Sequence, residues 1–213
     1  MLLVVEPRRD PDRGPMLRLS LAAYCCALLF ACAGTAQAAD KVSVEATRRD
    51  EALEVVCRAV LDAPLDLVWQ TLTDYDRLAE FIPGMRRSRV IERRGAVAVI
   101  EQSGEVGFLF LTFSIDVTLA STERPPHALE VSMLKGNLKR LDGAYRIEPQ
   151  GDGRILLTWT GIVEALSMPP LLGELVMRSN IEDQFRGMVR EIERRDALRR
   201  ESQRRAREGA RQQ

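Results

Sequence analysis

Six extended runs follow one another through the middle of the chain, separated only by short turn signals, and apolar and polar residues alternate most clearly at 112–119. Strands joined by connections this short pair as antiparallel neighbours, so the runs predict a meander. An earlier apolar run at 55–61 brings the predicted sheet to seven strands, with one face buried and the other in water. The six runs cover residues 88–93, 96–104, 108–121, 128–135, 138–149 and 154–163.

Only the segment after Pro169-Pro170 is long enough to cover the buried face of such a sheet. Its apolar residues form two sets on nearly opposite sides of an ideal helix, and the pattern S-x-x-E at 179–182 is that of a capping box. We therefore predict a short helix over 170–178, a break at Ser179-Asn180 and a long helix from Ile181. The arginine-rich end, 201–213, is predicted to overhang the sheet as a basic helical tail.

Residues 62–90 predict two short helices between the first strand and the meander. Apolar side chains recur at helical spacing over 65–72, and we expect Trp69 in this stretch to be a core residue. Asp74 and Asp76 lie at a break where capping or turn roles are expected of them, and Pro83-Gly84 ends the helical stretch.

The sequence V-W-x-x-L-T-D-Y-D-R-L-x-E-F-I-P at 68–83 resembles the START-like (SRPBCC, helix-grip) superfamily. Within it, the chain is most similar to the polyketide cyclase/dehydrase and lipid transport family, including its coenzyme Q-binding branch. The resemblance extends from about residue 54 to residue 192. It implies an α+β helix-grip fold, in which a seven-stranded curved antiparallel sheet surrounds a long C-terminal helix and two short helices lie between strands 1 and 2.

The start of the chain has the pattern of an export signal. A positive start at Met16, an apolar run and an A-x-A site predict a signal peptide over 1–38, cleaved after Ala38, with residues 1–15 a miscalled start. A retained anchor helix, or lipidation at Cys32, are the alternatives. Residues 39–50 are predicted as a linker or edge strand, residues 51–200 as the ligand-binding domain, and the location as periplasmic or secreted.

The charge distribution argues against nucleic-acid binding, because residues 39–189 hold 18 basic and 23 acidic residues. The arginine-rich tail is interpreted as a solvated helix end, with transient contact to anionic lipid headgroups as the alternative. His127, the only histidine, is expected in a surface turn, and Cys57 is expected to be a buried, inert thiol. We expect no metal and no cofactor.

The resemblance implies an internal cavity for a hydrophobic ligand of ~300–1,000 Å³. The leading hypothesis is non-catalytic binding or transport of an isoprenoid quinone, a lipid or a polyketide-like molecule. The alternatives are a cyclase or dehydratase, with a proton-transfer site drawn from Glu101, Arg140, Glu164 and Tyr145, and a protein-interaction module. No catalytic residue is assigned. The candidate cavity-lining residues are Phe81, Ile82, Met85, Phe108, Phe110, Phe113, Met133, Tyr145, Trp159, Leu172, Val176 and Phe185.

Overall fold

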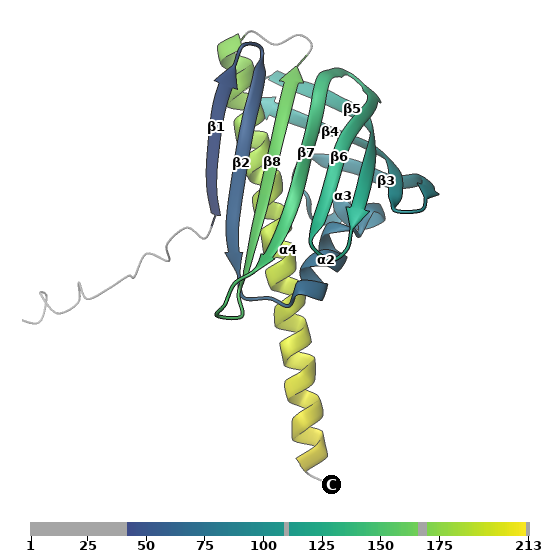
Figure 1. Ribbon diagram of the computed structural model, residues 1–213, viewed down its shortest axis with the longest axis vertical. Helices are drawn as coiled ribbons and strands as arrows, with labels where there is room; N and C mark the ends of the chain where they lie inside the picture. Colours follow the sequence, from purple (N-terminus) through teal and green to yellow (C-terminus); the bar gives the residue numbers. More distant parts are fainter. Residues whose placement is uncertain (1–41, 109–110, 166–169, 212–213) are drawn as a thin grey trace, which may run out of the picture. The chain divides into compact units, whose positions relative to one another are not determined.

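A computed structural model of the protein describes residues 42–108, 111–165 and 170–211. The predicted leader, with its cleavage site after Ala38, lies outside the described residues. Within them, eight antiparallel strands form one sheet in the order β1-β2-β8-β7-β6-β5-β4-β3 (Figure 1). The strands are β1 (Val42–Arg49), β2 (Ala52–Leu61), β3 (Met85–Arg94), β4 (Val97–Phe108), β5 (Leu111–Arg124), β6 (Ala128–Gly136), β7 (Leu138–Pro149) and β8 (Ile155–Ala165).

The strand beyond the predicted seven, β1, comes from the segment 39–50, for which a linker was one of two expectations. It pairs with β2 along its whole length, from Val42↔Ala59 to Arg49↔Ala52. The side chains of Val42, Val44 and Ala46 alternate with exposed polar ones, so β1 has one apolar face despite its charged composition. The segment is therefore an edge strand of the domain and not a linker.

The helical elements between β2 and β3 are α2 (Leu65–Leu72), a 3₁₀ turn η1 (Tyr75–Arg77) and α3 (Leu78–Phe81). Trp69 of α2 is half-buried and packs against the core, as predicted. The two aspartates at the break do not cap these helices. Asp76 instead accepts a hydrogen bond from the backbone N–H of Val90 on β3 (2.8 Å), and Asp74 pairs with an arginine of the last helix.

The last helix, α4 (Pro170–Arg211), runs through Ser179-Asn180 without interruption, so the predicted break is wrong. Asn180 accepts a hydrogen bond from Gln184 one turn later (2.9 Å), and Glu182 pairs with Arg186 in the same way. Glu182, the acidic residue of the supposed capping box, is thus bonded forward along the helix and not back to Ser179. The prediction of two opposite buried faces counted Leu175 as buried, but its side chain is 50% exposed.

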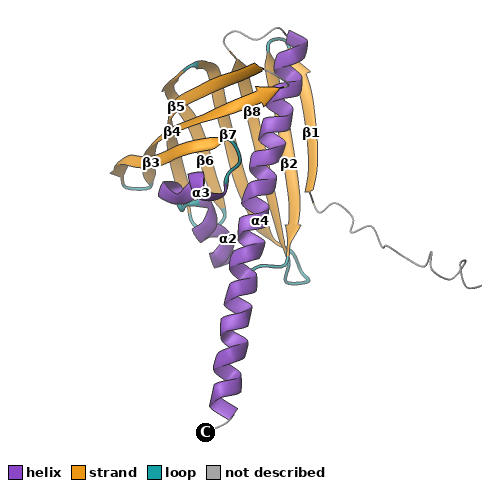
Figure 2. Cartoon of the chain, turned by 180° about the vertical axis from the view of Figure 1, so that it is seen from behind, coloured by secondary structure: helices purple, strands orange, loops and turns teal. Residues whose placement is uncertain are grey.

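The buried stripe of α4 is continuous once Leu175 is left out of it. Met177, Ile181, Gln184, Met188 and Ile192 are spaced three or four residues apart, so one straight helix presents them all to the sheet. In Figure 2, α4 lies across the concave face of the sheet, and its C-terminal part continues beyond the strands.

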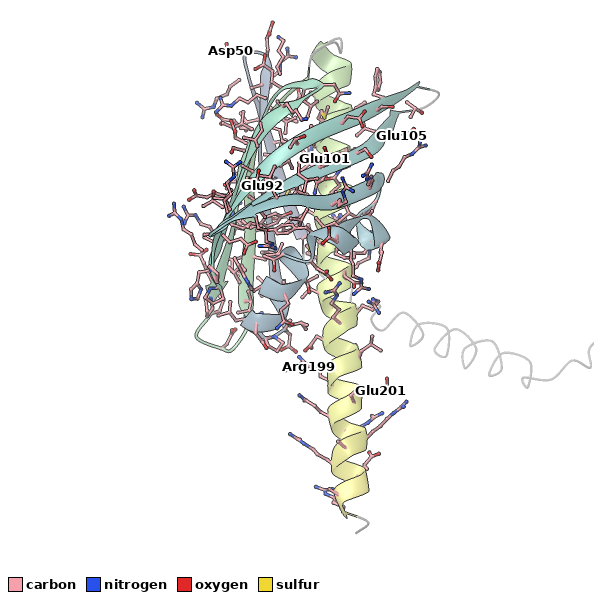
Figure 3. The ribbon with its side chains drawn as sticks, turned by 90° about the vertical axis from the view of Figure 1, so that its right-hand side faces the viewer. Asp50, Glu92, Glu101, Glu105, Arg199 and Glu201 are labelled. Carbon is pink, nitrogen blue, oxygen red and sulfur yellow. The ribbon has the colours of Figure 1, made fainter. Side chains whose placement is uncertain are left out.

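The overhanging part of α4, residues 197–211, is largely exposed. Figure 3 shows Arg199 and Glu201 projecting outward from it below the sheet. Contact of this basic segment with a membrane surface stays a prediction. None of the described helices combines the length and apolar character needed to cross a membrane.

Candidate functional site

A cavity lies between the concave face of the sheet, α4 and the short helices after β2. It has two compartments with a shared wall formed by Met85, Gln102, Leu141, Val163, Ile181 and Gln184. The larger compartment extends toward α2 and η1, where Leu72 and Tyr75 border it. The smaller one extends toward the beginning of β3 and the first turns of α4, where Gly84 and Asn180 border it.

The space in both compartments is smaller than the sequence-based expectation. The volume that the centre of a water-sized sphere can occupy is about 160 Å³ in the larger compartment and about 100 Å³ in the smaller. Both exceed the room that a single water needs, but both fall short of the ~300–1,000 Å³ of typical pockets for drug-sized ligands. The cavity as it stands fits a compact group rather than a whole long-chain lipid.

Two aromatic residues form the sheet side of the larger compartment. Tyr145 on β7 and Trp159 on β8 are directly opposed across the strands, with ring centroids 4.7 Å apart and planes tilted by 42°. The indole of Trp159 lies against Gly143 and Gly161, where an added Cβ would come within 2.2 Å and 2.8 Å of its ring atoms. Absence of side chains at these two glycines therefore allows the ring to lie close to the backbone.

The Tyr75 hydroxyl, on the η1 side of the larger compartment, is fully hydrogen-bonded. The Tyr75 hydroxyl lies 3.1 Å from Ser121 Oγ and donates to Glu123 Oε1 (3.0 Å), and the Arg93 guanidinium lies over the Tyr75 ring. Burial raises the pKa of the Tyr75 hydroxyl, so it is neutral at physiological pH. This network ties η1 to β5, and both the Tyr75 and the Ser121 hydroxyl have a partner within it.

Five predicted lining residues do border the cavity. They come from the loop after α3, from β3, from the aromatic pair and from α4, and all line the larger compartment. These residues are Ile82, Met85, Tyr145, Trp159 and Phe185.

Four other predicted lining residues occupy neighbouring positions without bordering the cavity. The ring of Phe81 packs beneath the guanidinium of Arg195, with 5.4 Å from Cζ to the ring centroid. Phe113 is half-buried on β5, and Met133 packs against the core from β6. Val176 is buried, but its neighbour Met177 borders the smaller compartment instead.

Three predictions fall wholly or partly outside the described residues. Phe110 belongs to the undescribed pair 109–110, and the side chains of Phe108 and Leu172 are likewise not described. Their predicted place in the cavity stays a prediction.

Several lining residues were not among the candidates. Helical apolar spacing could have identified the lining residues on α2, η1 and α3, and strand alternation those on β4 and β5. The polar lining residues break the alternation of apolar and polar side chains, so neither pattern indicates them. The overlooked residues of the larger compartment are Leu72, Tyr75, Leu78, Ile100, Gln102, Leu119, Ser121, Leu129, Val131, Leu141, Val163, Ile181, Gln184 and Met188.

The four residues considered for proton chemistry do not meet. Glu101 pairs with Arg89 (3.6 Å), Arg140 with Asp142 (2.7 Å) and Glu164 with Lys139 (3.0 Å). Only Tyr145 borders the cavity. In the described ranges no cluster of three histidine, cysteine or acidic side chains is placed to bind a metal ion.

Residues 74–85, which we call the lid segment, are held on α4 by Arg195. Its Nη2 donates to Asp74 (2.8 Å) and its Nε to Glu191 (2.7 Å), while its guanidinium covers the Phe81 ring. At Gly187 of α4 the lid comes so close that an added Cβ would lie 2.4 Å from Pro83 Cδ. The lid segment therefore closes one side of the cavity through a polar contact and a close backbone approach.

Acid is expected to weaken this arrangement at Glu191, whose side chain is only 6% exposed. Hydrogen bonds from Arg194 and then Arg195 lower the pKa of this carboxyl from 4.5 to about 2. A pKa depressed by folding stabilises the native state above the unfolded pKa and loses that effect as pH falls toward the folded value. In urea unfolding, the parent protein should lose stability between pH 5 and pH 2.5. Glu191→Gln should reduce that loss in the free energy of unfolding by about 2 kcal/mol. Parallel pH profiles for the variant and the parent would contradict this assignment.

Comparison with known proteins identifies the family of the chain. The family described as polyketide cyclase / dehydrase and lipid transport matches residues 61–193, more than half of the chain. The chain belongs to this family. No curated protein matches it significantly.

Several solved structures share the fold of this member of the polyketide cyclase/dehydrase and lipid transport family. A STAR-related lipid transfer protein from Xanthomonas axonopodis has a TM-score of 0.62 at 13% identity, over 73% of this chain and 95% of that one. The ZhuI aromatase/cyclase from Streptomyces sp. R1128 has a TM-score of 0.59 at 18% identity, over 68% and 95%. A human lipid transfer and protein localization domain has a TM-score of 0.59 at 13% identity, over 85% and 98%. At these identities the similarities establish the helix-grip fold, with eight strands here instead of the expected seven.

Proposed function

We propose that this protein binds and carries an apolar small molecule in the cavity under α4, without transforming it, after export from the cytoplasm. The observation that carries the proposal is the lining of the larger compartment. Its described wall residues include no Asp, Glu, Lys, Arg or His. Burying apolar ligand surface against such a wall is favourable by ~25 cal/mol per Å², whereas a wall without these groups offers little for general acid–base catalysis.

The family description and the lipid transfer proteins of similar fold support a carrier. The predicted leader supports export, and an isoprenoid quinone would fit with its ring in the cavity and its tail outside. The similar fold of an aromatase/cyclase keeps a cyclase or dehydratase as the second candidate, in which Tyr145 would polarise a bound polyketone.

Extraction of the native ligand tests the proposal most directly. We expect protein purified from the exported fraction to release a stoichiometric apolar compound, detected by mass spectrometry after organic extraction. Incubation of that compound with fresh protein should return it unchanged. Recovery of a cyclised or dehydrated product would favour the enzyme, and retention of the chain in the cytoplasm would remove the export part of the proposal.

A further inference from the structure

One hydroxyl in the larger compartment has no partner within the described part of the chain. Tyr145 borders the cavity, and none of the hydrogen bonds among the described residues involves its phenol. No described side-chain oxygen or nitrogen is both shut off from open space and unbonded. The Tyr145 hydroxyl therefore borders the cavity itself, in contrast to the bonded hydroxyl of Tyr75.

The protonation state of this group is fixed by its surroundings. Burial raises the pKa of the Tyr145 hydroxyl, so it stays a neutral group able to donate a hydrogen bond. The indole N–H of the opposed Trp159, which can only donate, likewise has no partner among the described residues. Two unused donors in the wall of one compartment favour a ligand that carries an acceptor oxygen there.

The shape of this wall adds a second constraint. The tilted Tyr145–Trp159 pair, lying close to the sheet over Gly143 and Gly161, presents ring faces and edges to the cavity. Aromatic surfaces of this kind pack well against another flat ring. The limited volume of the larger compartment, about 160 Å³, also suits a compact ring more than a branched or bulky group.

The larger compartment has no charged group in its described wall. Among the described residues that line the larger compartment there is no acidic or basic side chain to pair with an ionised ligand. An unpaired carboxylate or phosphate would lose its hydration there without compensation, which is strongly unfavourable. Glu105, which borders the smaller compartment, is paired with Arg86.

We propose that the buried part of the ligand is a neutral planar ring bearing a carbonyl oxygen, as in a quinone or a cyclic enone. This inference rests on the proposed binding function. Tyr145 is the specificity-determining residue, because its hydroxyl donates to that oxygen while its ring and Trp159 pack against the ligand ring. An ionised fatty acid or a phosphate headgroup does not occupy this compartment.

The test uses three probes with equilibrium dialysis of the full chain and of Tyr145→Phe. Duroquinone is a fully substituted quinone that cannot alkylate a thiol, durene is the same methylated ring without carbonyl oxygens, and dodecanoate is an anionic chain. We expect Tyr145→Phe to weaken duroquinone binding about three- to tenfold, the effect of one neutral hydrogen bond, and to leave durene binding within about twofold. Dodecanoate should bind more weakly than duroquinone to the parent protein.

A matched control removes a hydroxyl from the outer face of the same sheet. Thr160→Val, at an exposed position on β8, should leave the affinity for all three probes unchanged. Equal duroquinone affinity in the parent and Tyr145→Phe, or tighter binding of dodecanoate than of duroquinone, would overturn the ligand class while durene binding still supported an apolar carrier. Failure of all three probes to bind, with ligand-free protein confirmed by extraction, would count against the binding function as well.

Discussion

Replacing Arg195 by leucine is expected to lower the free energy of unfolding by about 2 kcal/mol and to loosen the lid segment. Breaking a buried ion pair by removing one partner typically costs about 3–5 kcal/mol. Here the cost is smaller because both carboxylates keep another arginine: Glu191 pairs with Arg194 (2.7 Å), and Asp74 lies 3.6 Å from Arg77. Urea unfolding would give the stability change, and hydrogen exchange of residues 74–85 would report the lid.

The matched control lies further along the same helix. Arg204 is 72% exposed, and its ion pair with Glu208 is long, at 4.0 Å. Arg204→Leu should therefore change the free energy of unfolding by less than about 0.5 kcal/mol. Arg195→Lys should be intermediate, because a lysine keeps the charge but cannot contact Asp74, Glu191 and the Phe81 ring at once. Equal losses for Arg195→Leu and Arg204→Leu would show that Arg195 does not anchor the lid.

The fold was largely predictable because each of its elements leaves a local pattern. Alternation placed Tyr145 and Trp159 on the inner face of the sheet, and the motif at 68–83 located the short helices. Judging by charge or by a local motif alone was less reliable. The charged residues of 39–50 left the choice between linker and edge strand open although Val42 and Val44 alternate, and the capping pattern at 179–182 lies within an unbroken helix.

The site was less predictable, since alternation tells which way a side chain faces and not whether space remains beside it. Phe81 and Tyr145 are both large aromatic residues at plausible inner positions. One is covered by Arg195 from 114 residues away in the sequence, and the other borders an open cavity. That difference depends on long-range packing among α4, the lid segment and the sheet, which a single sequence does not encode in any local pattern.

Adding one methyl group at Gly143 is expected to disturb both stability and the cavity. A Cβ there would lie 2.2 Å from Trp159 Cη2 and 2.8 Å from the carbonyl oxygen of Thr160, so the indole must move away from the sheet. Overpacking of this kind costs about 1–3 kcal/mol, and we expect Gly143→Ala to lose about 2 kcal/mol in urea unfolding. The displaced ring enters the larger compartment, so duroquinone binding should fall and the fluorescence of Trp159 should change.

Two further variants separate this steric effect from a backbone effect of glycine. Gly151→Ala, in the β7–β8 turn where an added Cβ meets nothing within 4 Å, should be neutral or slightly stabilising. Combining Gly143→Ala with Trp159→Phe should recover part of the lost stability, because the smaller ring leaves room for the new methyl group. Strict additivity of the two substitutions would mean that the indole does not depend on Gly143 for its position. In that case the aromatic wall would be maintained by its contact with Tyr145 and not by the absence of a side chain behind it.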